Sequence, residues 1–159
     1  MASTLDILTR LNRHKVEFVV VGGLAGVVHG SALVTEDVDI CAPLNQENLT
    51  RILAALAGVN PRFRMSPQRP PLPGDAESLV GYKNLYLITD LGQIDFLSEI
   101  TGVGAYEEVS RHTIAVELAG VRVHVMDIHA LIESKKALGR AKDLRTAAEL
   151  EAIRDRLRQ

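Results

Sequence analysis

A strand–glycine–helix–strand pattern between residues 19 and 40 restricts the fold of this chain more than any other feature. The first strand is apolar and runs into Gly22-Gly23, a helix of small residues follows, and the second strand carries Asp37 and Asp39. Because side chains alternate across a strand, the two carboxylates share one face while their apolar neighbours point to the other. The pattern therefore predicts a strand whose acidic face lies opposite an apolar one.

Two carboxylates held side by side repel each other, by roughly 4 kcal/mol for a pair ~4 Å apart at an effective dielectric of ~20. Proteins commonly compensate such a pair with divalent cations, and hard oxygen ligands suit Mg²⁺. The glycine pair leaves bare backbone N–H groups at the mouth of a helix, where phosphate binds well. Metal and phosphate sites placed together indicate chemistry on a nucleoside triphosphate.

Composition narrows the class of protein further. The 159 residues are enough for one domain, and an apolar content of 47 % is ample for its core. The formal net charge of −2 provides no general attraction to nucleic acid or to an anionic membrane. Cys41 is the only cysteine, which excludes an intrachain disulfide and a cysteine-based zinc site. With no leader peptide or membrane span recognisable, we expect a reduced, cytoplasmic protein with no membrane contact.

Hydrophobic periodicity and capping residues predict an alternation of helices and strands. The predicted helices are 3–13, 24–29, 46–56, 128–138 and 142–157, and the predicted strands are 16–21, 38–42, 85–89, 93–97, 113–118 and 121–125. This order indicates an α/β (α+β) protein with a mixed sheet covered by helices. We expect one compact domain, with a core of residues 1–126 and a helical extension, residues 127–159, packed on it.

Residues 58–81, here called the arginine–proline segment, differ in composition from the rest of the chain. Five of the six prolines fall in this segment, together with Arg62, Arg64 and Arg69. It is long enough to be a functional loop or an irregular sheet edge. Its arginines either keep a loop soluble or form a collar for an anionic acceptor such as RNA.

A third acid on a later strand would complete a site for two metal ions. The best candidate is Asp95, which lies between Ile94 and Phe96 in a predicted hairpin strand. If its two apolar neighbours face the core, Asp95 is displayed on the opposite face, as the first two acids are. Asp90 competes for this role, but its place in the Asp-Leu-Gly turn of the hairpin argues against it.

Together these features resemble the nucleotidyltransferase fold of the DNA polymerase β superfamily. That family combines a Gly-Gly or Gly-Ser turn, an acid-x-acid pair further along and a third acid on a later strand. Small bacterial nucleotidyltransferases are the closer resemblance, because their segment reads like His29-Gly30 followed by Thr35-x-Asp37-x-Asp39-Ile40. The tail is also similar to theirs, with the pattern Leu131-Ile132-x-x-Lys135-x-Ala137-x-Gly139-Arg140-x-Lys142-Asp143-Leu144.

The resemblance implies transfer of a nucleoside monophosphate group from an NTP to a hydroxyl or similar acceptor, with release of pyrophosphate. It implies two Mg²⁺ ions, and it makes Asp37, Asp39 and Asp95 both the metal ligands and the catalytic residues. Asp95 would lie nearest the acceptor and could draw its proton. The nucleotide-binding residues that it implies are Gly22, Gly23, Thr35 and Lys135.

One position departs from these relatives. Many of them carry an arginine two residues before the threonine, where this chain has Leu33. If that arginine holds phosphate or acceptor, its loss weakens the case for a fully active enzyme, although Lys135 or a cation of the arginine–proline segment could replace it. Lys135, Lys136, Arg140 and Lys142 either form a solvated helix end or reach the triphosphate.

Three functions are compatible with the sequence. The first is an active nucleotidyltransferase, with a tRNA end, a partner protein's side chain or a small molecule as acceptor, in a toxin–antitoxin-like system. The second is a catalytically impaired module on the same fold that binds nucleotide or a partner. The third, aminoglycoside-type resistance, needs a large acidic pocket, which an arginine-rich acceptor loop disfavours. A homodimer and a hetero-complex both remain open.

Overall fold

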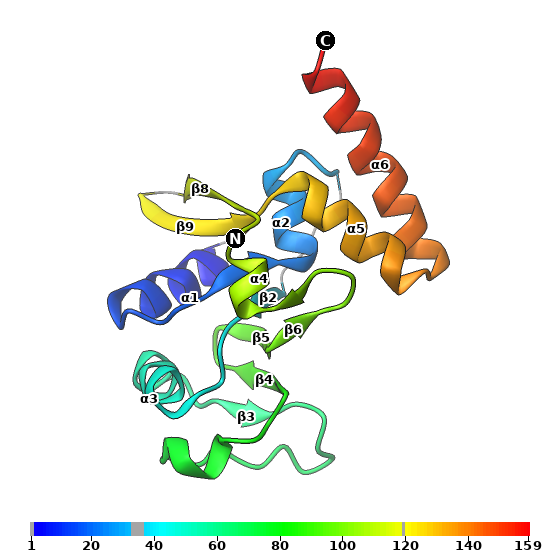
Figure 1. Cartoon of the computed structure of the whole chain (residues 1–159). Helices are drawn as coiled ribbons and strands as arrows, with labels where there is room; N and C mark the ends of the chain where they lie inside the picture. Colours follow the sequence, from blue (N-terminus) through cyan, green and yellow to red (C-terminus); the bar gives the residue numbers. More distant parts are fainter. Residues whose placement is uncertain (1, 33–36, 119) are drawn as a thin grey trace.

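The structure of the chain, a computed structural model, describes residues 2–32, 37–118 and 120–159 (Figure 1). Its strands are β1 (Val19–Val21), β2 (Val38–Cys41), β3 (Arg62–Phe63), β4 (Asn84–Thr89), β5 (Gly92–Leu97), β6 (Glu99–Ile100), β7 (Gly104–Ala105), β8 (Thr113–Leu118) and β9 (Val121–Met126). Its helices are α1 (Ala2–Arg13), α2 (Gly22–Val28), α3 (Gln46–Ala55), α4 (Tyr106–Val109), α5 (Ile128–Leu138) and α6 (Ala141–Leu157), and a 3₁₀ turn, η1, covers Ala76–Leu79.

Seven of these strands form one mixed sheet in the order β3-β4-β5-β2-β1-β9-β8, and β6 pairs with β7 separately. The pairs β2–β5 and β1–β9 are parallel. The other neighbouring strands of the large sheet are antiparallel. The predicted α/β (α+β) class with a mixed sheet is therefore confirmed.

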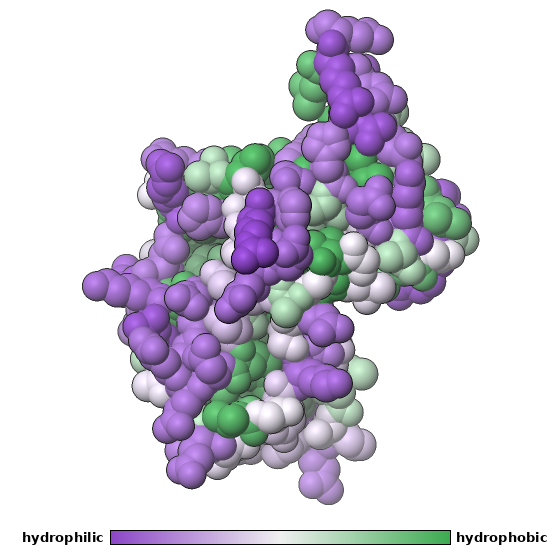
Figure 2. Space-filling model, in the orientation of Figure 1, coloured by the Kyte–Doolittle hydropathy of each residue, from purple (hydrophilic) through white to green (hydrophobic). Residues whose placement is uncertain are grey.

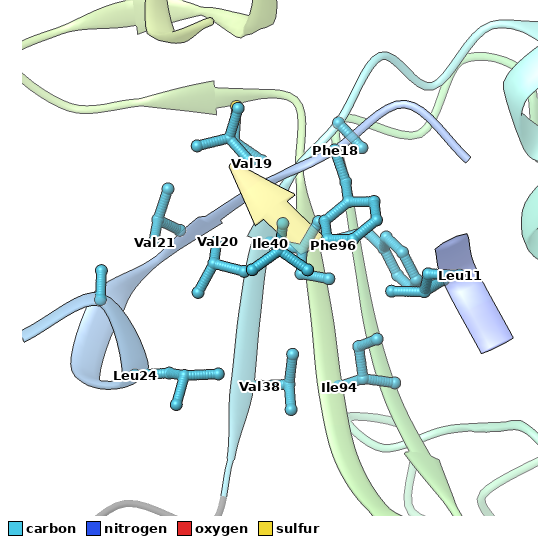
Figure 3. Packing of buried hydrophobic residues seen from close by; sticks show 14 of the residues in the cluster. Leu11, Phe18, Val19, Val20, Val21, Leu24, Val38, Ile40, Ile94 and Phe96 are labelled. Carbon is cyan, nitrogen blue, oxygen red and sulfur yellow. The ribbon is translucent and has the colours of Figure 1, made fainter. Parts of the chain in front are cut away.

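An apolar row crosses the middle of the sheet and forms part of its core. Val20 lies opposite Ile40, Ile40 opposite Phe96, and Phe96 opposite Leu85. Each of these side chains is at most 1 % exposed, and burial of one stabilises the fold by about 1.5–3 kcal/mol. Figure 3 shows Ile40 lying between Val20 and Phe96 in this row. Alternation along each strand then directs the neighbouring residues to the other face.

Helix boundaries follow capping residues that the sequence displays. The side chain of Asn45 accepts a hydrogen bond from the backbone N–H of Asn48 at the start of α3, at 2.9 Å. Asp127 caps α5 in the same way through the N–H of Ala130, at 2.8 Å. Helix α5 ends before Gly139, whose φ of +71° is the left-handed conformation that favours glycine.

Several local features differ from the prediction. Strand β1 has only three residues, and α2 begins at Gly22, so the glycine pair opens the helix instead of forming a turn before it. The arginine–proline segment follows the second of its two predicted alternatives, a sheet edge, because it contributes the edge strand β3, which pairs with β4, and the turn η1. The pair β6–β7 and the short helix α4 were not predicted, because elements of two to four residues carry no hydrophobic period.

The two C-terminal helices lie close to α2. Helix α5 contacts α2 directly. From α6, Glu149 accepts a hydrogen bond from the Ser31 hydroxyl at 2.7 Å, and Ile153 is buried. The last turns of α6 project beyond the rest of the chain and leave Leu157 76 % exposed (Figure 1). Over the described residues, no helix combines the length and apolarity needed to cross a membrane. The division between residues 126 and 127 remains a prediction.

Candidate active site

A second row of residues crosses the sheet next to the apolar one. Val21, Asp39, Asp95 and Tyr86 oppose one another in turn across β1, β2, β5 and β4. Because Asp39 and Asp95 are register partners on parallel strands, they leave the same face about one strand spacing (~4.8 Å) apart. Asp95 therefore lies on the face that alternation predicts for it.

The acids of this face differ in exposure. Asp37 is exposed directly before β2, whereas Asp39 is partly buried and Asp95 is 7 % exposed. Burial, followed by the negative charges of Asp95 and Asp37, raises the pKa of Asp39 to about 6. The cations Lys135 and Arg64 act in the opposite direction. Asp39 is thus the carboxylate whose charge most needs a compensating cation.

Gly22 brings the backbone at the start of α2 against Asp39. Its φ of +64° lies in the left-handed region. A β-carbon at this position would come within 2.9 Å of the Asp39 β-carbon and would overlap the carboxylate itself. Only glycine permits this approach, so the first N–H groups of α2 lie next to the acids.

A cavity of about 690 Å³ covers this acidic face. It is lined by the three acids and Gly22, by residues of β4, β5 and β6, and by the junction of α5 and α6. Its cationic lining residues are Arg64, Lys135, Arg140 and Lys142. Figure 2 shows the surface indented between the part that carries α5 and α6 and the part that carries β3 and β4. The volume is within the range that small-molecule sites occupy, about 300–1,000 Å³.

Asp143 organises the cations at the α5–α6 junction. It is only 2 % exposed and accepts a hydrogen bond from Arg140 Nε at 2.5 Å, and its Oδ1 lies 4.0 Å from Lys135 Nζ. The hydrogen bond from Arg140 holds the pKa of Asp143 below its usual range. Because both cations line the cavity, Asp143 keeps two positive charges at its edge.

The position of Arg64 in the cavity lining could not be predicted from the sequence. Its Nη2 donates to Asp95 Oδ2 at 2.6 Å, and this hydrogen bond raises the pKa of Arg64. Its guanidinium carbon lies 5.5 Å from the centre of the Tyr86 ring. The three arginines of the arginine–proline segment were predicted as one group, but only Arg64 lines the cavity. An ion pair between a loop and a strand leaves no periodic signal in the sequence.

The oxygens of the three acids suit a hard divalent cation such as Mg²⁺. All three acids line one cavity, and Asp95 Oδ1 is buried without a hydrogen-bond partner among the described residues. Arg64 holds the other oxygen of Asp95. Within the same part of the chain, no three acidic, histidine or cysteine side chains are already grouped as a metal site. The chemistry of the acids thus fits Mg²⁺, with Arg64 as the competing cation.

The structure brings most of the predicted site residues together. The predicted site residues that line the cavity are Asp37, Asp39, Asp95, Gly22 and Lys135. Gly23 belongs to α2 but is not one of the lining residues. Thr35 and Leu33 lie outside the described residues. Tyr86 was missed, although its alternation with the buried Leu85 and Leu87 places it on the acidic face.

The mixed sheet and the helices around it match a nucleotidyltransferase fold. One solved structure that the chain resembles is the crystal structure of a putative nucleotidyltransferase from Thermotoga maritima, with a TM-score of 0.54 and 20 % sequence identity. The match covers 96 % of this chain and 88 % of that chain. No protein-family description and no curated protein matches the sequence. At this identity the likeness establishes the fold, which confirms the fold predicted by resemblance.

Proposed function

We propose that this chain is a Mg²⁺-dependent nucleotidyltransferase, which transfers a nucleoside monophosphate group from an NTP to an acceptor. The observation that carries the proposal is the pairing of Asp39 with Asp95 across β2 and β5, under a cavity that Lys135 also lines. Acids and cations around one cavity match the two kinds of charge that a metal–triphosphate substrate presents. The low-identity structural neighbour of the same fold is consistent with this function.

The acids would hold the metal, and the backbone would hold phosphate. Asp37, Asp39 and Asp95 are the proposed ligands of two Mg²⁺ ions, which when bound neutralise charge on the transferring phosphoryl group. Gly22 lets the N–H groups at the start of α2 approach the β and γ phosphates, next to Asp39. Lys135, held by Asp143, lies where it can contact the triphosphate.

The acceptor would react on the Asp95 side of the cavity. Its hydroxyl would give its proton to the Asp95 carboxylate, of which Arg64 pairs with only one oxygen in this structure. The hydroxyl oxygen then bonds to the α-phosphorus, the bond from that phosphorus to the bridging oxygen breaks, and pyrophosphate leaves. Positioning and charge neutralisation supply most of the rate in such transfers.

The experiment is incubation with each of the four NTPs, labelled at the α-phosphate, with Mg²⁺ and with total RNA, protein extract or the chain alone. We expect pyrophosphate release and covalent transfer of label with at least one combination, and loss of both after chelation or in Asp39→Asn. The matched control is Asp90→Asn, which changes an exposed acid in the β4–β5 turn. Equal turnover by the Asp39 variant would contradict the proposal.

A second candidate is a catalytically impaired module that binds nucleotide or a partner. The ion pair between Arg64 and Asp95 favours it, because it occupies one oxygen of the third acid. This module would bind NTP in the same assay without releasing pyrophosphate from any of the four. A neighbouring reading frame for an all-helical protein would support the toxin–antitoxin context and a protein acceptor. The localisation in the cytoplasm stays an expectation.

A further inference from the structure

The ion pair between Arg64 and Asp95 leaves polar atoms unsatisfied on both sides. Asp95 Oδ1 and Arg64 Nε are both buried, and neither has a hydrogen-bond partner in the described part of the chain. The side chains of Arg64 and Asp95 are 22 % and 11 % exposed, so water reaches the pair poorly. A buried polar atom without a partner destabilises the arrangement that holds it. The ion pair therefore leaves one polar atom of each of its two charged groups without a hydrogen bond.

Arg64 also has a second partner within reach. Its backbone N–H donates to the Tyr86 carbonyl at 2.9 Å, so the chain at Arg64 is tied to β4 independently of the side chain. The Tyr86 ring lies 5.5 Å from the guanidinium and is 36 % exposed. A guanidinium over a tyrosine ring is a favourable arrangement in itself. Arg64 can thus leave Asp95 without moving the backbone or losing every partner.

We propose that Arg64 is a built-in counter-ion of Asp95, which it pairs with in the metal-free protein and releases toward the Tyr86 ring when a divalent cation takes the carboxylate. Arg64 then acts as a positioning residue, because it decides when Asp95 is available as a ligand. The inference rests on the proposed function in that it takes the acids as a metal site. Its consequence is that the wild-type chain binds metal more weakly than its carboxylates alone would.

A double-mutant cycle on Mn²⁺ binding tests this inference without any turnover. Free Mn²⁺ is measured by electron paramagnetic resonance, at fixed pH and without nucleotide, for wild type, Arg64→Gln, Asp95→Asn and the double variant. We expect Arg64→Gln to lower the Kd for Mn²⁺ about tenfold or more, since a competing charge at ~5 Å is removed. The gain should be clearly smaller in the double variant, because most of it comes from freeing Asp95. The part that remains is the direct effect of the Arg64 charge on Asp39.

The controls separate this mechanism from a general charge effect. Arg62→Gln removes a charge two residues away, at a side chain that contacts the Asn60 carbonyl, and should leave the Kd unchanged. Arg64→Lys keeps the charge and should stay near wild type. If Arg64→Gln unfolds, the same cycle is run with Arg64→Met, which removes the charge and keeps an unbranched side chain. A Kd for Mn²⁺ equal to that of wild type then overturns the inference.

Three results would overturn the inference. If Arg64→Gln binds Mn²⁺ as wild type does, and Asp39→Asn abolishes binding in both, Arg64 is a structural partner only and the proposed metal site stands. If neither chain binds Mn²⁺ and Asp39→Asn changes nothing, the inference and the proposed function fall together. A tenfold gain that persists in the double variant also contradicts the inference, because the effect would not involve Asp95.

Discussion

Gly22 and Asp39 approach so closely that no side chain fits between the start of α2 and the carboxylate. The contact brings together the glycine pair and the acid pair of the strand–glycine–helix–strand pattern. It also joins two functions, because N–H groups that suit phosphate lie next to oxygens that suit metal.

Gly22→Ala should destabilise the protein and weaken NTP binding together. The added methyl group needs the left-handed conformation, which costs roughly 1–2 kcal/mol, and it also displaces the Asp39 carboxylate. Gly58→Ala is the matched control, because Gly58 has a φ of +88° but nothing within 4 Å of its added carbon. Urea unfolding and NTP titration of both variants measure the difference. Equal effects would mean that backbone conformation alone matters at Gly22.

Asp39→Asn should raise the free energy of unfolding at neutral pH when no divalent cation is present. The folded-state pKa of Asp39, about 6, lies above its ordinary value of 3.8, so between these values the folded state binds more protons than the unfolded state. Wild-type stability then increases as the pH falls through 6, and the charged group costs up to about 3 kcal/mol above that pH. Asparagine removes this cost.

The measurement for Asp39 is urea unfolding of wild type and variant from pH 4 to pH 8 in a chelating buffer. The variant should be more stable near pH 7.5, and the difference should close as the pH approaches 4. Asp90→Asn, at an exposed turn, should show no such pH-dependent difference. A variant that is less stable than wild type at pH 7.5 would show that Asp39 is already compensated within the chain.

Lys135→Gln should weaken NTP binding about tenfold or more while the fold is retained, because a charge-assisted hydrogen bond to phosphate contributes about 1.5–3 kcal/mol. The adjacent Lys136 is a close control, since it pairs with Glu151 at 3.2 Å and does not line the cavity. Lys136→Gln should bind NTP as wild type does. If Lys135→Gln and Lys136→Gln both bind NTP as wild type does, Lys135 does not contact the nucleotide.

Asp143→Asn should reduce both stability and NTP affinity. The buried carboxylate holds Arg140 and approaches Lys135, and its loss leaves these cations without their shared partner. Arg140 is mostly exposed, so the expected loss of stability is about 1–3 kcal/mol, below the value for a fully buried pair. Thermal unfolding and NTP titration measure the two effects, with Asp155→Asn on the exposed end of α6 as control. If Asp143→Asn leaves the NTP affinity unchanged, Asp143 does not support NTP binding through Arg140 and Lys135.

The sequence predicted those parts of the site that rest on local periodicity. Asp95 could be assigned to the acidic face because Ile94 and Phe96 must be buried, and the structure buries both completely. Asp127 could be predicted as a cap because it precedes an amphipathic helix. These residues obey rules that act within a few positions of the chain.

The parts that could not be predicted depend on contacts between distant segments. Arg64 reaches Asp95 from a proline-rich segment, and no spacing rule connects the two positions. At the start of α2, Gly22 lies against the Asp39 carboxylate, a contact that a glycine pair alone does not indicate. Tyr86 was within reach of prediction, because it alternates with buried leucines, but aromatic side chains on a sheet are common in many roles.

The most direct test of the account is anomalous diffraction from crystals soaked with Mn²⁺ and a non-hydrolysable NTP. The account predicts Mn²⁺ at the oxygens of Asp37, Asp39 and Asp95, with the triphosphate between the start of α2 and Lys135, and with Arg64 no longer bonded to Asp95. Nucleotide bound elsewhere, or nucleotide in the cavity with no Mn²⁺ at these acids, would contradict it.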